Sequence, residues 1–588
     1  MGFQVSPGVQ IQERDLTTII PAVATTSAGI AGQFRWGPID QRIIIDSESN
    51  LIQLFGVPDN NTAKFFFPAA NFLGYGNNLQ VVRVAGATAT NAIGGQTSGL
   101  TANVLIKNLD SYNNQTSSGN FSSNSNALVA AKYAGALGNT LKVELCDSTT
   151  GFNAWGLSGQ FSNTPGTSLY VQSIDGTAND EIHVAVIDED GLFSGSAGSV
   201  LEVYEGLSKA TDGKKADGSS NYYANVINQA SKYIYWLNHP TGITVKSTGT
   251  TSGYGSISYV AGFGATAGLF STSLSSGVDG GVLTNDQLVN GTGYGATASG
   301  YNLFSDSDTV DVSLLIAGPL TGSAAATVAN IARTRKDCVA FISTDNLDPT
   351  ELETTKTNRC TALKSSIGEN SYAFIDASWK YQYDRYNDLY RWVPLSGDIA
   401  GLAARTDDTN DPWWSPAGYN RGSIKNVIKL GFNPSQTYRD VIYPKGINPV
   451  VTFPGQGTIL FGDRTAQTKP SAFDRINVRR LFIVLEKAIA IAAKYQLFEF
   501  NDAFTRSMFV SMVEPFLRDV QARRGIYDFK VICDETNNTG QVIDSNGFVA
   551  SIFIKPARSI NWITLNFIAT RTGVNFEEVT SLNKPTTN

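Results

Sequence analysis

Histidines and cysteines, which commonly take part in catalysis or bind metal ions, are few and scattered in this chain. It has two histidines, His183 and His239, and no serine in a G-x-S-x-G elbow. It also lacks a G-x-x-x-x-G-K-[ST] loop for nucleotide phosphates. A nucleophilic triad, a His-rich metal site and a nucleotide-driven motor are therefore hard to build from these residues. We predict no enzyme activity, no catalytic residue, no metal site and no cofactor.

The cysteines and one acidic cluster support the same interpretation. The four cysteines are far apart and form no C-x-x-C pair, so we expect buried free thiols in a reducing compartment. Asp306, Asp308 and Asp311 have part of the spacing of a calcium loop, but the glycine and the distal glutamate of such a loop are missing. We interpret these three residues as solvated carboxylates at a strand edge.

The composition indicates a large acidic protein with several domains. The chain has 588 residues, 42% of them hydrophobic, and a formal net charge of -7. This length allows several buried cores, whereas a nucleic-acid binder would normally carry a concentrated basic surface. No apolar run reaches the length of a membrane span, and no signal peptide is visible. We expect a protein assembled in cytoplasm, without nucleic acid and without membrane insertion.

Arginine usage divides the chain. Arginines occur up to Arg83, are absent until Arg333 and are then frequent. The stretch between is rich in Gly, Ser, Thr and Asn, and short apolar or alternating runs at 141–145, 182–187 and 243–245 are separated by turn-forming clusters. We predict a β-rich, surface-exposed module of antiparallel strands, inserted into a core that both flanks build.

The flanking sequences alternate in the manner of a layered α/β unit. Residues 310–317 and 338–342 have the composition of buried strands, and the Ala-rich segment 324–331 between them favours a helix. Residues 372–376 extend the same sheet.

Two helices are expected near the C-terminal end. Apolar residues within 477–495 recur at three- and four-residue spacing, which lines one face of a helix. The opposite face carries charged residues, among them Arg479 and Arg480, and is expected to form a solvated basic rim. A second helix follows Asn501 and Asp502, whose side chains suit an N-cap, and ends near Gly525. Because Pro515 lies inside it, a kink or break is expected near Glu514.

Four short motifs follow one another in the last third of the chain. They are GLAARTD at 401–407, GDRT at 462–465, INVRR at 476–480 and LFEFN at 497–501. Each motif is weak alone, and none is a catalytic signature. Their order, together with VSPGVQIQE at 5–13, resembles the tail sheath proteins of contractile phage tails.

The resemblance implies a mixed α+β and α/β multidomain fold with extended terminal arms. The expected divisions are an N-terminal arm strand at 1–20, the N-terminal part of an α/β sheath core at 21–90, the β-rich insertion at 91–300, the C-terminal part of the core at 301–556, and a C-terminal strand and arm at 557–588. The residues expected to build the family's core motif are Gly401, Arg405, Asp407, Gly462, Arg464, Arg479, Arg480, Glu499 and Asn501.

The function that the resemblance implies is structural. A tail sheath polymerises around the tail tube as stacked hexameric rings and contracts from a metastable extended state, which drives the tube through the host envelope for genome delivery. The implied partners are further copies of this chain, the tail tube protein, the baseplate and the neck or tail terminator proteins. We expect the protein in the virion tail, after assembly in the host cytoplasm.

The two ends of the chain are expected to join neighbouring subunits. Both ends contain alternating apolar and polar residues typical of strands, and the resemblance implies that each adds to the sheet edge of a neighbour. Alternatively, they are edge strands of the chain's own sheet. The arm-strand residues are Val9, Ile11, Ile563, Leu565 and Phe567. A C-terminal helix is expected to contact the tube, with Arg479, Arg480, Lys487, Lys494, Arg518, Arg523 and Arg524 as the basic candidates.

Two other functions fit parts of the sequence. The sheath of a non-phage contractile injection system would share the core motifs. A β-rich adhesin or receptor-binding virion protein would explain the Gly/Ser/Thr/Asn-rich middle and leave the flanks unexplained. A sheath should still polymerise without residues 91–300, whereas an adhesin should lose its binding.

Overall fold

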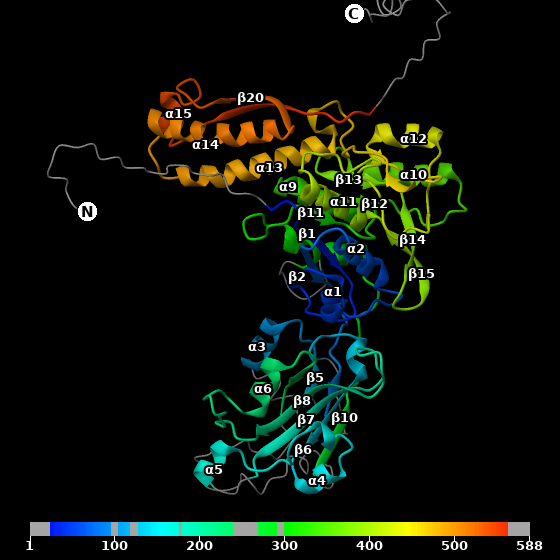
Figure 1. Cartoon of the computed structure of the whole chain (residues 1–588), viewed down its shortest axis with the longest axis vertical. Coiled ribbons are helices and arrows are strands. Elements are labelled where there is room, and N and C mark those ends of the chain that lie inside the picture. The colour runs from blue at the N-terminus through cyan, green and yellow to red at the C-terminus, as the bar shows by residue number, and fades with distance from the viewer. Residues whose placement is uncertain are drawn as a thin grey trace, which may run out of the picture.

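The computed structural model of the chain describes residues 24–95, 104–117, 128–175, 179–238, 268–290 and 299–561. These residues form two lobes (Figure 1). The lobe drawn at the top contains residues from both flanks, and the lower lobe contains most of the β-rich stretch between them. The predicted N-terminal arm at 1–20, the apolar run at 243–245 and residues 562–588 of the predicted C-terminal arm lie outside the described residues, as does His239.

A seven-stranded sheet forms the centre of the upper lobe. Three of its strands precede the β-rich stretch and four follow it, and β1 joins the two sets because it pairs in parallel with both β3 and β11. Only β2 is antiparallel to its neighbour. In sheet order the strands are β17 (Ile447–Asn448), β13 (Ala373–Asp376), β12 (Val339–Ser343), β11 (Leu314–Ile316), β1 (Ala28–Gly32), β3 (Leu79–Arg83) and β2 (Arg42–Ile45).

Helices cover this sheet and bury its central strands. Every residue of β12 is buried, as expected for a parallel strand with both faces covered. α2 packs with α11 near β1, β11 and β12, and α9 packs with α10 near β12 and β13. The strands predicted at 338–342 and 372–376 and the helix predicted at 324–331 are confirmed, and the strand predicted at 310–317 is confirmed over Leu314–Ile316. The helices are α1 (Glu48–Phe55), α2 (Ala63–Leu73), α9 (Gly322–Arg335), α10 (Glu353–Ile367), α11 (Ser396–Thr409) and α12 (Gln436–Ile442).

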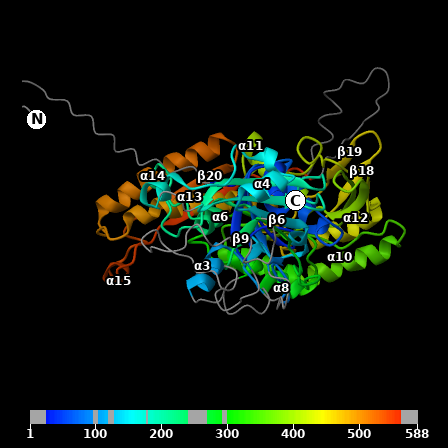
Figure 2. The same cartoon turned by 90° about the horizontal axis from the view of Figure 1, so that it is seen from below.

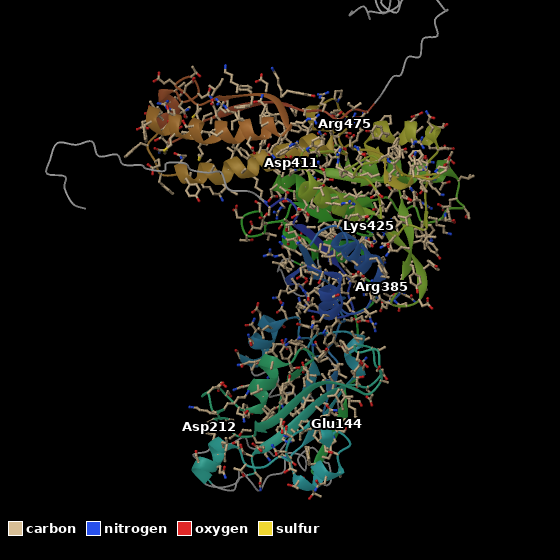
Figure 3. The ribbon with its side chains drawn as sticks, in the orientation of Figure 1. Glu144, Asp212, Arg385, Asp411, Lys425 and Arg475 are labelled. Atoms are coloured by element: carbon tan, nitrogen blue, oxygen red, sulfur yellow. The ribbon has the colours of Figure 1, made fainter. Side chains whose placement is uncertain are left out.

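Two hairpins extend from this lobe. The first is formed by β14 (Trp379–Asp384) and β15 (Leu389–Pro394), with β16 (Lys429–Leu430) along β14. Arg385 beyond its first strand forms an ion pair with Glu48 of α1 at 2.9 Å, and Figure 3 shows Arg385 at the lower edge of the lobe. The second hairpin consists of β18 (Val450–Phe453) and β19 (Gly457–Leu460).

The β-rich stretch contains two antiparallel sheets, which confirms the prediction of antiparallel strands. One has the order β10–β6–β7–β8 and the other β4–β5–β9. The ends of the stretch meet, because the Gly86 N–H donates to the carbonyl oxygen of Asp279 at 3.4 Å. The strands are β4 (Ile93–Gly94), β5 (Val129–Ala131), β6 (Leu141–Cys146), β7 (Glu181–Asp188), β8 (Ser199–Ser208), β9 (Ile234–Trp236) and β10 (Leu269–Ser273). The helices are α3 (Leu109–Ser117), α4 (Thr149–Ala154), α5 (Leu169–Asp175) and α6 (Tyr223–Ala230).

Two short helices after β10 belong to the core of the upper lobe. They are α8 (Asn285–Asn290) and the 3-10 helix η3 (Gly300–Phe304). Both pack near β1 and α9, and Leu288, Tyr301 and Phe304 are buried with the residues of the central sheet.

The C-terminal part of the described chain is a separate layer with its own core. Its elements are α13 (Ile476–Ala493), α14 (Ala503–Ala522), β20 (Ile526–Ile532), α15 (Gly540–Asp544) and β21 (Ser551–Pro556). Figure 2 shows α13 and α14 on one side of the molecule, with α10, α12, β18 and β19 on the opposite side. The α13–α14 hairpin projects away from the central sheet (Figure 1).

The two predicted C-terminal helices are confirmed, with one correction. Asp502 caps α14, because its side chain accepts the N–H of Thr505 at 2.8 Å. Of the kink or break predicted near Glu514, the break is wrong, since the helix runs through Pro515 to residue 522. Proline has no N–H, so the carbonyl of Ser511, four positions earlier, loses its helical hydrogen-bond donor. Ser511 and Pro515 both lie on the exposed side of α14, where water can hydrogen bond this carbonyl.

The cysteines and the described histidine have structural surroundings. All four cysteines are buried and unpaired, as predicted. His183 stacks on Phe161 with ring centroids 4.8 Å apart. Its Nδ1 accepts the Gly206 N–H at 3.0 Å, and its Nε2 lies 2.8 Å from the Asn163 carbonyl oxygen, so both ring nitrogens are occupied.

Candidate functional site: the root of the C-terminal segment

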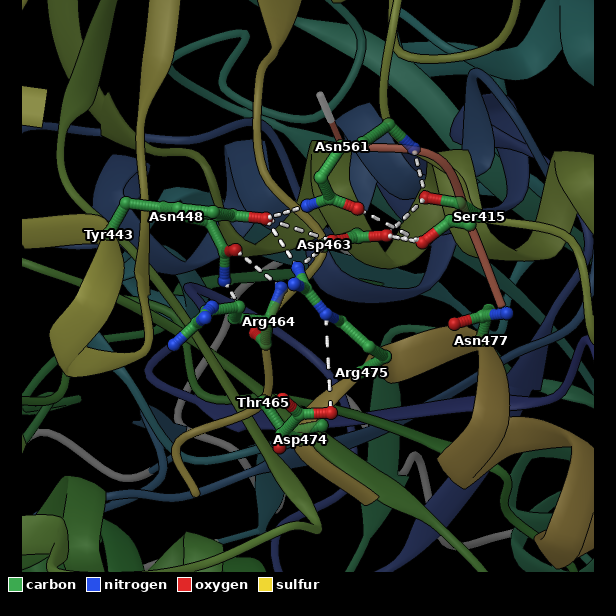
Figure 4. Close-up of polar contacts among 12 residues, drawn as sticks. Ser415, Tyr443, Asn448, Asp463, Arg464, Thr465, Asp474, Arg475, Asn477 and Asn561 are labelled. Atoms are coloured by element: carbon green, nitrogen blue, oxygen red, sulfur yellow. Dashed lines mark hydrogen bonds and ion pairs between the residues drawn. The ribbon is translucent and has the colours of Figure 1, made fainter. Parts of the chain in front are cut away.

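A polar network holds the last described residues of the chain against the core. Asp463 Oδ1 accepts hydrogen bonds from Arg475 Nη1 at 2.8 Å and from the Tyr443 hydroxyl at 3.0 Å (Figure 4). Its Oδ2 accepts from the Ser559 hydroxyl at 2.6 Å. Asn561 Nδ2 donates to the Tyr443 hydroxyl at 2.7 Å. We call these five residues the root network.

The ends of four elements bring the five residues of the root network together. Tyr443 directly follows α12, Asp463 follows β19 and Arg475 directly precedes α13. Ser559 and Asn561 follow β21, the last described strand. The network therefore ties the exit of the C-terminal segment to the α/β core.

Charges within the root network are matched. Burial raises the pKa of Tyr443 to about 12, and the Asp463 carboxylate acts in the same direction, so the phenol stays protonated and donates at neutral pH. Burial opposes the charge of Arg475, but the attraction of Asp463 outweighs it and raises the pKa of this guanidinium. The bond between Arg475 and Asp463 is therefore a charge-assisted hydrogen bond, which is stronger than a neutral one.

Asn448 and Gly462 shape the GDRT turn beside this network. The Asn448 side chain accepts the Arg464 N–H at 2.8 Å and donates to the Arg464 carbonyl oxygen at 2.8 Å. A Cβ on Gly462 would lie 2.8 Å from Asn448 Oδ1 and 2.9 Å from the Tyr443 ring. Only glycine fits there without displacing the Tyr443 ring and the Asn448 side chain.

Two arginines of the INVRR motif are buried. Arg480 forms an ion pair with Asp407, and its other amino group donates to the Ala403 carbonyl oxygen at 3.3 Å. Arg479 donates to the Tyr372 hydroxyl at 3.1 Å, and its guanidinium lies 3.8 Å from the centre of the Phe473 ring. The prediction that both arginines lie on a solvated rim is wrong. Inside the protein, their guanidinium groups donate to hydroxyl, carbonyl and carboxylate oxygens of distant segments.

The other motif residues lie in three different surroundings. Gly401 of α11 is buried against Tyr75, where a Cβ would lie 2.6 Å from the ring. Arg405 and Glu499 are exposed. Asn501 donates to the Gly547 carbonyl oxygen at 2.8 Å and so joins the start of α14 to the loop after α15.

The remaining basic candidates for tube contact differ in their exposure. Lys487 is largely covered and pairs with Asp311. Lys494, at the end of α13, is exposed. Arg518 pairs with Glu514 on the surface of α14. Arg523 pairs with Asp411 and stacks over Trp413, while Arg524 stacks over Trp414.

An open groove of about 1160 Å³ lies beside the root network. Aromatic and arginine side chains from the segment 413–421, α12 and the end of α14 line it, together with residues 557–561. Such a surface can bind a peptide segment through stacking and charge-assisted hydrogen bonds.

Among the described residues, no group of three or more His, Cys, Asp or Glu side chains is placed to hold a metal ion. None of the helices in the described ranges is both long enough and apolar enough to cross a membrane.

Sequence reasoning missed most of the root network. Asp463 belongs to the GDRT motif, but the resemblance points to Gly462 and Arg464 as the core-motif residues of that stretch. Tyr443, Arg475 and Ser559 carried no signal, because single polar residues become partners only when distant segments meet. The predicted arm residues Val9, Ile11, Ile563, Leu565 and Phe567 lie outside the described residues.

Two family models match the chain. The phage tail sheath protein central domain matches residues 295–466, and the phage tail sheath C-terminal domain matches residues 468–570. The tail sheath protein of Vibrio phage KVP40 is 35% identical, and that of Enterobacteria phage T4 is 34% identical, each over 98% of this chain and 99% of the relative.

A solved structure shows the same fold at low sequence identity. The sheath tail protein of Desulfitobacterium hafniense superposes with a TM-score of 0.51 at 11% identity, over 94% of this chain and 100% of that protein.

Proposed function

Because this chain belongs to the phage tail sheath protein family, we propose that its copies stack as hexameric rings around the tail tube and are joined by their terminal segments. Membership of this family makes the protein a structural, non-enzymatic component of a contractile virion tail. The proposed partners are the tail tube protein, the baseplate and the neck or tail terminator proteins, after assembly in the host cytoplasm. The adhesin alternative is not retained, since the relatives align with 98% of the chain, flanks included.

The observation that carries this proposal is the unpaired sheet of the C-terminal layer. β20 and β21 pair only with each other among the described residues, which leaves both outer edges without a strand partner. Partly buried side chains of both strands pack against the core of α13 and α14. A two-stranded sheet is marginally stable alone, and its open edges are templates for strand addition.

Two open edges match two terminal segments. We infer that the strand around Val9 and Ile11 of one neighbour pairs with one edge, and the strand containing Ile563, Leu565 and Phe567 of another pairs with the second. Each backbone hydrogen bond contributes only about 1 kcal/mol net. One arm therefore binds weakly, whereas a lattice of such contacts holds subunits together while their cores move during contraction.

The tip of the α13–α14 hairpin is the surface that we propose for tube contact. Its large apolar side chains are exposed, with Phe498 at 104%, Phe500 at 84% and Phe504 at 74% of full accessibility. A cluster of this kind on a projecting hairpin marks an interaction surface. The exposed Lys494 lies at the same tip and Arg518 on α14, so both remain candidates for contacts to the tube.

We also propose the domain divisions, with arms at 1–20 and 557–588 and a core formed by both flanks, which takes in α8 and η3 as well as residues 301–556. The sharing of one sheet by β1 and β11 supports a core made of both flanks. For the insertion, the contact between Gly86 and Asp279 supports limits near residues 87 and 279, in place of 91 and 300.

Proline substitution tests the strand-addition proposal. Proline removes one N–H, so it disrupts an added strand only where that N–H points toward the partner edge. Single Pro variants at each position from 563 to 568 should therefore prevent tube formation at every second position, as seen by negative-stain electron microscopy. Circular dichroism of the unassembled variants serves as the folding control. Equal tolerance at all six positions would show that the segment does not join subunits as a strand.

A further inference from the structure

The groove beside the root network has an excess of positive charge. Arg421, Arg439, Arg524 and Arg558 line it, and none of them has a carboxylate partner in the described part of the chain. The lining includes two acidic residues, of which Asp463 is already bonded to Arg475. Asp440 alone cannot balance four guanidinium groups.

Aromatic rings hold three of these guanidinium groups in place. Arg421 and Arg524 both stack on Trp414, with distances of 5.1 and 5.4 Å from guanidinium carbon to ring centre. Arg439 lies 5.8 Å from the centre of the Phe461 ring. Burial lowers the pKa of Arg421, and no neighbouring carboxylate offsets this effect. Stacked guanidinium groups with free donors are suited to carboxylates on a peptide that also carries apolar side chains.

We propose that this groove binds the segment around Glu577 and Glu578 of a second copy of the chain, an inference that rests on the exchange of C-terminal segments proposed above. These are the only acidic residues in 562–588, and Phe576 and Val579 flank them. The adjacent carboxylates match the arginines, and the apolar neighbours match the aromatic walls. In the N-terminal segment, by contrast, Arg14 separates Glu13 from Asp15 and reduces their charge.

Chain length indicates a second copy as the source of this segment. Asn561 lines the groove and belongs to the root network, so the C-terminal segment starts there. If residues 562–571 pair with a neighbour as a strand, they carry the chain about 33 Å away from Asn561. The six residues from 572 to 577 span at most about 20 Å and cannot bring Glu577 back to its own groove.

Peptide binding to the unassembled full-length protein tests this inference. The probe is a fluorescent peptide of residues 572–583, measured by anisotropy with dilute protein. We expect binding to the wild-type protein, and a loss of affinity of about tenfold or more in R421E/R439E, since two charge pairs become repulsive. A peptide with both glutamates changed to lysine should bind R421E/R439E better than the wild type. R333E, a charge reversal on the exposed face of α9, is the matched control and should leave binding unchanged.

The competing outcomes are distinct. If wild-type protein forms tubes and yet neither it nor the full-length E577Q/E578Q variant binds the peptide, the groove inference is overturned and the sheath proposal stands. Peptide binding to E577Q/E578Q but not to the wild-type monomer would show that the chain's own segment fills the groove, which overturns the second-copy assignment. Failure of the wild-type chain to form tubes would instead count against the proposed assembly.

Discussion

Arg480 and Asp407 form an ion pair inside the protein although 73 residues separate them in the sequence. Their side chains are 4% and 3% exposed. Asp407 lies in the region that matches the sheath central domain and Arg480 in the region that matches the C-terminal domain, so the pair joins the two regions.

Removing the arginine of this pair should destabilise the fold strongly. Arg480→Met leaves Asp407 buried without its counter-charge, which costs about 3–5 kcal/mol. The unfolding midpoint of the unassembled protein in urea should fall accordingly. Arg480→Met/Asp407→Leu should recover part of the loss, because the unpaired charge is gone, whereas Arg333→Met should leave the midpoint unchanged. Equal midpoints for Arg480→Met and wild type would contradict the interior role of the pair.

Asp463→Asn should loosen the root of the C-terminal segment. The substitution keeps the shape of the side chain but removes the charge of the nearer of the two carboxylates beside Arg475 and leaves only Asp474 at 4.0 Å, at a cost of about 3 kcal/mol. Hydrogen exchange of the backbone amides at 557–561 should become faster while α9 is unaffected. Ser559→Ala removes only one of the bonds to Asp463, so it should produce the same effect at a smaller size.

Glu369 should make stability depend on pH in the acidic range. Burial opposes its charge, but hydrogen bonds from Thr468 and Lys364 outweigh burial and lower its pKa from 4.5 to about 2. A lowered carboxyl pKa gives stability that is present above pH 4.5 and is lost as the pH falls toward 2. Wild-type protein should therefore unfold at a higher temperature than Glu369→Gln at pH 7, and the difference should shrink between pH 4.5 and 2. A constant difference across this interval would argue against the assignment.

Polar substitution at the α13–α14 tip should separate self-assembly from tube binding. Phe498 has a φ of 72°, and asparagine tolerates this left-handed conformation, so Phe498→Asn/Phe500→Ser preserves the backbone. Purified sheath should still form hollow tubes, but it should no longer co-sediment with purified tail tubes. Leu169→Ser, which changes a residue 80% exposed in the β-rich lobe, is the control. Normal co-sedimentation of the double variant would exclude the tip as the tube contact.

The β-rich insertion should be dispensable for assembly. Residues 87–279 can be replaced by a short Gly-Ser linker, because the two ends of this stretch already touch. This deletion leaves Leu288, Tyr301 and Phe304 in the core. The shortened chain should fold and form tubes of smaller outer diameter in electron micrographs. A variant that lacks residues 91–300 also loses Leu288 from the core and should be less stable than the variant that lacks 87–279. Loss of assembly in the first variant with its fold intact would give the insertion a role in subunit contact.

Local features of the sequence were sufficient to predict individual elements. The apolar spacing within 477–495 predicted α13, because a helix that packs on one side requires that period. Asp502 predicted the start of α14 for an equally local reason, since its side chain reaches an N–H only three residues away. The order of the four motifs was also sufficient to recognise the family.

Only the tertiary structure decided where the charged residues of those elements lie. The spacing of apolar residues defines the buried face of a helix and predicts that the charged residues, Arg480 among them, lie on the opposite, solvated face. The side chain is buried instead, because Asp407 and the Ala403 carbonyl come to it from another helix. The contact between Asp463 and Ser559 likewise joins residues 96 positions apart. Such partners are set by the packing of distant segments, and the spacing of residues along the chain carries no information about them.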